Sequence, residues 1–300
     1  MIPEIPDLPH EIKKAAINRD LVIFIGAGVS MQLGCKNWAE LANNLIKKCY
    51  EFKGESGVSC INFRERKSLN EEYDYKKVIT MCYNILKTNG HESLFFDELK
   101  ESLKGDEDII NQPNIYDELR RLDAIYITTN ADEHFDPKFD IRNLMYKEGD
   151  FNSSEIKNLN LYHIHGSLKD EESLVFTVER YISRYNDREF KNFLDEIFDK
   201  YLILFLGYSM NEFELIDYLI SKVKKEERSE KEIQHFILLP FYAHEDNLLN
   251  FYQFYYNEMK IKVIGYAYDK KGYSQLYKIL QKWNSEIFFE SKDEIDRLLQ

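Results

Sequence analysis

The sequence predicts an α/β protein whose mostly parallel β-sheet carries helices on both faces. Short apolar runs alternate with longer amphipathic segments, which is the pattern of strands that alternate with helices. Several of the short runs are rich in Ile, Val, Leu and Phe without polar alternation, as is typical of strands covered on both faces. A length of 300 residues and a hydrophobic fraction of 44% suit one large domain, or a domain with one sizeable insertion.

The elements can be placed along the chain from these runs. The predicted strands are 21–25, 124–128, 161–165, 201–206, 235–239 and 261–266. The predicted helices are 38–50, 73–87, 91–103, 115–122, 212–223, 244–258 and 273–283. The interval at about 52–122 breaks the alternation, so we expect a helical insertion there, which opens with an exposed polar loop over 52–70. The polar stretch 138–160 is expected to be a mobile segment, and residues 1–300 are expected to form a single domain.

Composition excludes several classes of protein. The chain has 40 basic and 53 acidic residues, a net charge of −13, which repels phosphate backbones and anionic lipid. We therefore expect no direct nucleic-acid binding and no membrane association. There is no apolar run near the ~18 residues of a membrane span, and no basic-then-apolar leader, so a cytoplasmic location is expected. The four cysteines are isolated, which predicts neither a disulfide framework nor a zinc ribbon.

The first predicted strand ends in Gly26-Ala27-Gly28, with Ser30 close behind. Glycines at a strand end allow a tight turn and close approach to a ligand, and a following helix N-terminus would attract a pyrophosphate. The next glycine, Gly34, comes too late for the G-x-G-x-x-G pattern of dinucleotide-binding proteins. A tight strand-to-helix turn without a ligand therefore remains an alternative.

Three other predicted strands also end in polar residues that are able to bind a ligand. These ends are Thr128-Thr129-Asn130-Ala131-Asp132, His163-Ile164-His165-Gly166-Ser167 and Gly207-Tyr208-Ser209. In open parallel sheets, ligands bind beyond the carboxyl ends of the strands, where such residues gather. The four strand ends together predict one nucleotide site.

Simpler explanations exist for the individual residues. Asn130 and Asp132 would also serve as caps of a following helix or turn. His163 and His165 lie two apart on a strand, which would suit a metal pair, but no third ligand is near them in the sequence. His163 alone is more typical of a packed strand residue than of a catalyst.

In this order and spacing, the four segments resemble the motifs of the sirtuin superfamily. The Thr-Thr-Asn and Gly-Tyr-Ser forms are most similar to a bacterial sirtuin-like branch found in antiviral defence. The resemblance implies a Rossmann-like domain that binds NAD as its substrate, with Asn130 and His165 as catalytic residues. The residues that it assigns to NAD binding are Gly26, Ala27, Gly28, Ser30, Asp132, Gly166, Gly207, Tyr208 and Ser209.

Two departures from the sirtuin pattern affect the expected activity. Protein-deacylating sirtuins carry a zinc module with two cysteine pairs after the histidine motif, whereas residues 168–200 contain no cysteine, so no zinc is expected. Their Gly-Ile-Pro-Asp-Phe-Arg segment is replaced by Gly34-Cys35-Lys36-Asn37-Trp38, which puts a pocket for acyl-lysine in doubt.

The resulting interpretation is an NAD⁺ glycohydrolase that releases nicotinamide and ADP-ribose and depletes NAD in antiphage defence, a form of abortive infection. An enzyme that depletes NAD must stay inactive until it is triggered, so we expect a homo-oligomer, an activating partner protein or a phage-derived trigger. Two alternatives stay open: an NAD-dependent protein deacylase or ADP-ribosyltransferase, and a non-catalytic module that binds NAD or ADP-ribose.

Overall fold

The computed structural model describes residues 1–54, 57–208 and 235–298, with 289–298 as helical backbone only. Its centre is a seven-stranded parallel sheet in the order β3-β4-β2-β1-β5-β6-β7. The strands are β1 (Leu21–Ile25), β2 (Ile125–Thr128), β3 (Leu144–Met145), β4 (Leu161–His163), β5 (Leu202–Leu206), β6 (His235–Phe241) and β7 (Ile261–Ala267). The Rossmann-like α/β class predicted from the sequence is confirmed.

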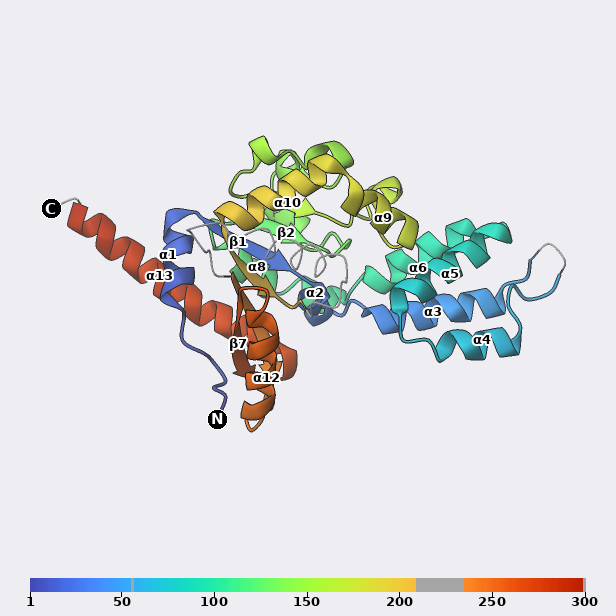
Figure 1. Ribbon diagram of the computed structural model, residues 1–300, viewed down its shortest axis with the longest axis horizontal. Coiled ribbons are helices and arrows are strands. Elements are labelled where there is room, and N and C mark those ends of the chain that lie inside the picture. The colour runs from blue at the N-terminus through green and yellow to red at the C-terminus, as the bar shows by residue number, and fades with distance from the viewer. Residues whose placement is uncertain (55–56, 209–234, 299–300) are drawn as a thin grey trace.

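The helices surround this sheet, as Figure 1 shows. They are α1 (His10–Asn18), α2 (Ala27–Ser30), α3 (Trp38–Glu51), α4 (Phe63–Asn70), α5 (Tyr75–Thr88), α6 (Glu92–Leu103), α7 (Glu107–Ile110), α8 (Ile115–Arg120), α9 (Val178–Asn186), α10 (Arg188–Lys200), α12 (Asp246–Asn257) and α13 (Gln275–Leu298). The helix predicted over 212–223 lies outside the described residues.

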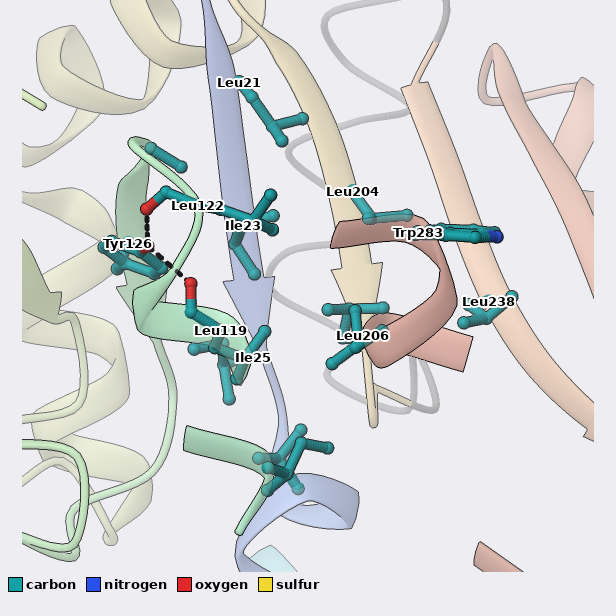
Figure 2. Packing of buried hydrophobic residues seen from close by; sticks show 14 of the residues in the cluster. Leu21, Ile23, Ile25, Leu119, Leu122, Tyr126, Leu204, Leu206, Leu238 and Trp283 are labelled. Atoms are coloured by element: carbon teal, nitrogen blue, oxygen red, sulfur yellow. Dashed lines mark hydrogen bonds between the residues drawn. The ribbon is translucent and has the colours of Figure 1, made fainter. Parts of the chain in front are cut away.

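The sheet is buried on both faces because alternate strand residues enter two different hydrophobic clusters. Val22 and Phe24 of β1 pack toward α10. Leu21, Ile23 and Ile25 point to the other face, toward α1, α8 and α13. Figure 2 shows this second face, where Trp283 of α13 packs among the leucines of β5 and β6. Such two-sided burial explains why the strands read as continuous apolar runs.

The chain enters the sheet in the middle, at β1, and builds outward in both directions. One branch runs through β2 and β4, and the other through β5, β6 and β7. The order reverses between β1 and β5, and ligands of open α/β sheets bind at the carboxyl ends of the strands near such a switch point. The pocket described below is lined by residues that follow β1 and β2, at this edge of the sheet.

Helices α3 to α6 form a helical module that stands to one side of the sheet (Figure 1). Its core includes Leu45 of α3, Val78 of α5 and Leu99 of α6, and Ala131 and Phe176 join it to the sheet-bearing part. Helix α8 packs on the sheet instead, through Ile115 and Leu119 in the cluster with α13.

Two local predictions were wrong. The stretch 52–70 is not simply a polar loop, because its last eight residues form α4, capped by Asn62 in a capping box with Glu65. The stretch 138–160 is not a loose segment, because β3 within it pairs with β4 and Phe151 is buried in the core. Both elements are short and have few apolar residues, so periodicity does not reveal them. In the described part of the chain, no helix is long and apolar enough to cross a membrane.

Candidate functional site at the carboxyl edge of the sheet

The loops after β1 and β5 are interlocked by glycines. Gly28 donates its N–H to the carbonyl of Gly207 over 2.8 Å, and Gly26 donates to Leu206 over 2.9 Å. A Cβ on Gly26 would lie 2.6 Å from the Gly207 oxygen, and Gly207 has φ +60°. The glycines therefore allow the two loops to touch, which is a structural role beside any role in binding a phosphate.

The glycine turn leads into one helical turn, α2, and a 3₁₀ turn at Met31–Leu33, before α3 begins at Trp38. The long helix α3 thus starts ten residues after Gly28, where the sequence predicts it, and the helix that directly follows the glycine turn is the four-residue α2. Ala27 lies at the start of α2 and lines the pocket described below.

Ser30 is the hub of a buried hydrogen-bond network. Its hydroxyl donates to Asp132 Oδ2 over 2.5 Å, and it accepts from Asn130 Nδ2 over 2.7 Å. Because the single hydroxyl proton of Ser30 goes to Asp132, the Tyr116 hydroxyl at 3.0 Å acts as a donor to Ser30. The network joins the loop after β1 to the loop after β2, 100 residues further along the chain, and to Tyr116 of α8, which lies 86 residues after Ser30.

Asn130 is held rigidly and presents one free acceptor. Its Nδ2 also donates to the Gly26 carbonyl over 3.0 Å, so both amide hydrogens are used inside the protein. Its Oδ1 makes no hydrogen bond with another described residue, which leaves this oxygen to accept one from a ligand hydroxyl or water. Neither Asn130 nor Asp132 caps a helix, although Asp132 accepts from the His134 backbone N–H.

These residues line a small pocket of about 40 Å³. Ala27, Ser30, Asn130 and Asp132 form its polar side, and Trp38 with Phe176 forms an aromatic wall, their ring centroids 5.4 Å apart. The pocket has room for a few water molecules. An aromatic wall in the same lining as an amide and a carboxylate suits a planar ligand that carries hydrogen-bonding groups.

His165 lies beside this pocket, and it is not among the lining residues. It is buried, its Nε2 lies 3.2 Å from the Tyr185 hydroxyl of α9, and its ring packs on Tyr181. Burial, with the charges of Arg184 and Lys76, holds the pKa of His165 well below its usual range, so the imidazole is neutral. The His165 carbonyl accepts from Val175, the neighbour of Phe176, which ties this histidine to the pocket wall.

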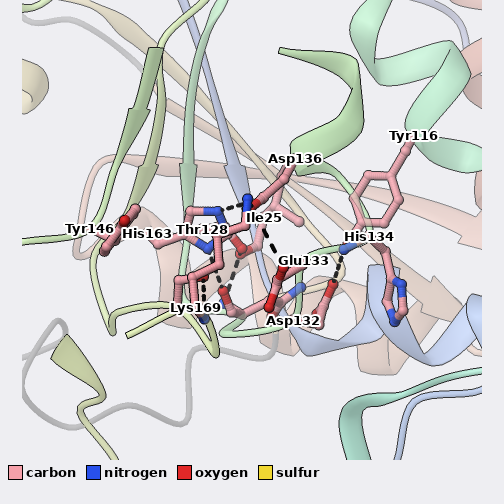
Figure 3. Close-up of polar contacts among 12 residues, drawn as sticks. Ile25, Tyr116, Thr128, Asp132, Glu133, His134, Asp136, Tyr146, His163 and Lys169 are labelled. Carbon is pink, nitrogen blue, oxygen red and sulfur yellow. Dashed lines mark hydrogen bonds and ion pairs between the residues drawn. The ribbon is translucent and has the colours of Figure 1, made fainter. Parts of the chain in front are cut away.

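His163, which the sequence analysis interpreted as a packed strand residue, is buried in a polar network. Its Nδ1 lies 2.9 Å from the Asn130 carbonyl and its Nε2 lies 2.9 Å from Asp136 Oδ1 (Figure 3). Both partners are acceptors, so both ring nitrogens donate. Burial alone would lower the pKa of His163, but the hydrogen bond and charge of Asp136 outweigh it and raise that pKa.

A buried charge cluster thus lies beneath the loop that carries Asn130. Lys169 Nζ approaches Asp136 Oδ2 at 2.7 Å, and although burial opposes ionisation, His163 and Lys169 lower the Asp136 pKa. A buried ion pair is costly unless fully hydrogen-bonded, and here each charge has a partner. Sequence reasoning missed this cluster because Asp136 lies 27 residues before His163 and no local pattern pairs the two.

Two of the remaining predicted site residues, Gly166 and Tyr208, have a clear role in the fold itself. Gly166 has φ +79°, and a Cβ there would overlap the Ser173 carbonyl, so this glycine shapes the loop after β4. Tyr208 is buried against Phe24, with ring centroids 5.3 Å apart. Ser209 lies outside the described residues. Within the described ranges, no group of three or more His, Cys, Asp or Glu side chains could hold a metal ion.

Part of the chain matches a known protein family. Residues 124–264 match a family model described as a SIR2-like domain, and no curated protein matches the chain. The matched range includes Asn130, Asp132 and His165, whereas the glycine turn after β1 precedes it. Members of this family are typically NAD-dependent enzymes, which implies that the chain uses NAD. The SIR2-like match over residues 124–264 supports a place for this chain in the sirtuin-like superfamily.

Proposed function

We propose that this chain is an NAD⁺ glycohydrolase that cleaves NAD to nicotinamide and ADP-ribose. The observation that carries the proposal is the hydrogen bonding of Asn130, a residue that lines the pocket. Its amide hydrogens are used within the protein, whereas its Oδ1 is left to accept a hydrogen bond from a ligand. An acceptor fixed in this way would position a ribose hydroxyl or the attacking water without reorganising during the reaction.

The chemistry needs few groups. The bond between the nicotinamide nitrogen and ribose C1′ breaks, water adds to C1′, and one proton is released. Positive charge grows on the sugar in an oxocarbenium-like transition state. The Asp132 carboxylate, buried and fixed by Ser30, would stabilise that charge in a site of low dielectric. The neutral imidazole of His165 would accept the proton, provided that α9 allows water to reach it.

The remaining proposed residues would hold the rest of the dinucleotide. The N–H groups of Gly26 and Gly28 are already used within the protein, so the turn that they shape would meet the pyrophosphate through the Ala27 N–H. Gly207 and Ser209 would meet the adenosine ribose. No zinc enters this scheme. The biological role that we propose is NAD depletion in antiphage defence, controlled by self-assembly, by an activating partner protein or by a phage-derived trigger.

Release of nicotinamide from NAD tests the proposal. The full chain should release nicotinamide, alone or after addition of extract from phage-infected cells, and Asn130→Ala should slow release at least a hundredfold, about 2.7 kcal/mol of barrier. Asn143→Ala, which changes an asparagine outside the pocket, should keep the wild-type rate.

Other outcomes separate the alternatives. Release that strictly requires an acylated peptide or a modified protein acceptor would instead indicate a deacylase or an ADP-ribosyltransferase. Tight NAD or ADP-ribose binding without release under every condition would indicate a non-catalytic module.

A further inference from the structure

Helix α12 exposes an aromatic face that no described element covers. It packs on β7 through Tyr256, which is buried. On its outer side the exposed fractions are 65% for Phe251, 41% for Tyr252, 70% for Phe254 and 54% for Tyr255. We call this face, extended by Tyr242 and Leu248, the α12 patch. Contiguous exposed apolar surface of this kind is typical of a protein–protein contact.

The α12 patch differs from the rest of the surface in its charge. Asp246 is the single charged residue of α12, whose sequence is DNLLNFYQFYYN, whereas 31% of the chain is charged. Leu248, Phe251 and Tyr255 lie at helical spacing and form one stripe along the helix. A chain of net charge −13 repels a copy of itself over most of its surface, and this neutral stripe is where that repulsion is weakest.

We propose that the α12 patch is the contact between two copies of this chain related by a two-fold axis. A two-fold contact joins the same surface of both copies, so it must be self-complementary. A face of aromatic rings, asparagine and glutamine meets that condition, because rings stack on rings and amides pair with amides.

The available area supports the assignment. The exposed fractions of the four aromatic residues of α12 add up to somewhat more than two complete side chains. At about 200 Å² for each aromatic side chain, the exposed area is roughly 450 Å². Burial in both copies, with Tyr242 and Leu248 at the edge, brings the total to roughly 1,000 Å², the size at which a specific interface becomes stable. Figure 1 places α12 away from the helical module, and no α12-patch residue lines the pocket, so the pairing leaves the site open.

Sedimentation velocity or light scattering of the full chain without NAD tests the proposal. We expect a species of twice 35.9 kDa at micromolar concentration. Phe251→Glu places two carboxylates in the contact and should raise the dimer dissociation constant at least about thirtyfold, the loss of one hot-spot residue. Phe63→Glu is the matched control, because Phe63 on α4 is 69% exposed and lies outside the α12 patch.

Each possible outcome decides the proposal. A monomeric wild type would overturn it, and so would a dimer that survives both Phe251→Glu and the uncharged Phe254→Asn. Equal loss of the dimer in Phe63→Glu would also overturn it, as would dissociation by high salt, since an apolar contact resists salt. Circular dichroism melts confirm that the variants fold. Because NAD is absent, this result is independent of the proposed hydrolase activity.

Discussion

At the scale of single residues, the site depends on which atoms of a polar side chain are already engaged. Asn130 and His163 show this most clearly. Asn130 donates both of its amide hydrogens, one to the Gly26 carbonyl and one to the Ser30 hydroxyl. His163 donates from both ring nitrogens, to the Asn130 carbonyl and to Asp136. His163 is therefore a positioning residue that fixes the backbone from which the Asn130 side chain projects.

The charge on His163 predicts a pH dependence of stability. Its pKa is raised on folding, so its contribution is complete below the unfolded pKa of about 6.5 and is lost as pH rises through the higher folded pKa. Asp136 has a lowered pKa, so its contribution is present above about pH 3.9 and is lost as pH falls through the lower folded pKa. The pair stabilises the fold most between these two values.

We expect the free energy of unfolding of wild type to exceed that of His163→Gln most near pH 6, with the difference shrinking toward pH 9. Urea denaturation of both proteins across this range measures it. His244→Gln, which changes an exposed histidine, should run parallel to wild type. A difference that stays constant or widens with pH would show that His163 is neutral in the folded protein.

At the scale of elements, the interlocked loops after β1 and β5 set the geometry of the switch point. Gly207 has φ +60°, and a Cβ there would lie 2.5 Å from the backbone nitrogen of Val29. Two separate penalties would therefore act on a substitution, one from the backbone conformation and one from overlap with the neighbouring loop.

Gly272 allows these penalties to be separated, because it has φ +57° but open space around it. Gly272→Ala should cost about 1–2 kcal/mol, the cost of a left-handed conformation in an L-residue. Gly207→Ala should cost clearly more, because backbone atoms cannot move aside as a flexible side chain can. Chemical denaturation compares the two, and equal losses would mean that the loops separate easily.

At the scale of the whole molecule, the structure has two packing units. The sheet with its two hydrophobic clusters is one, and the helical module α3–α6 with its own core is the other. Ala131 and Phe176 belong to the module's core and also line the pocket, so the pocket lies at the boundary between the units. Motion of the module relative to the sheet would therefore open or close the space beside Asn130.

Hydrogen exchange should reveal this division. Amides of β1 and β5 should exchange most slowly, because β1 is completely buried in the middle of the sheet and β5 pairs along its whole length. Helix α4 should exchange fastest within the module, because Leu69 is its only buried residue among those described. Mass spectrometry of exchanging peptides measures both, and protection of α4 equal to that of β1 would contradict the division.

Much of this architecture follows from the sequence by itself. Short apolar runs identified six of the strands, and several of these runs are unbroken because a strand buried on both faces has no polar alternation. The residues after the runs pointed to the edge where Ser30, Asn130 and Asp132 meet. The short β3 and the polar α4 were missed, since neither has enough apolar residues to show a period.

Only the tertiary structure decided which atoms meet. Tyr116 reaches Ser30 across 86 residues and His163 reaches Asp136 across 27, and no local pattern encodes such distances. It also separated His165 from the pocket lining and left four aromatic residues of α12 exposed to solvent. The physical reason is that periodicity records which face of an element is apolar, whereas the order of strands in the sheet determines what that face touches.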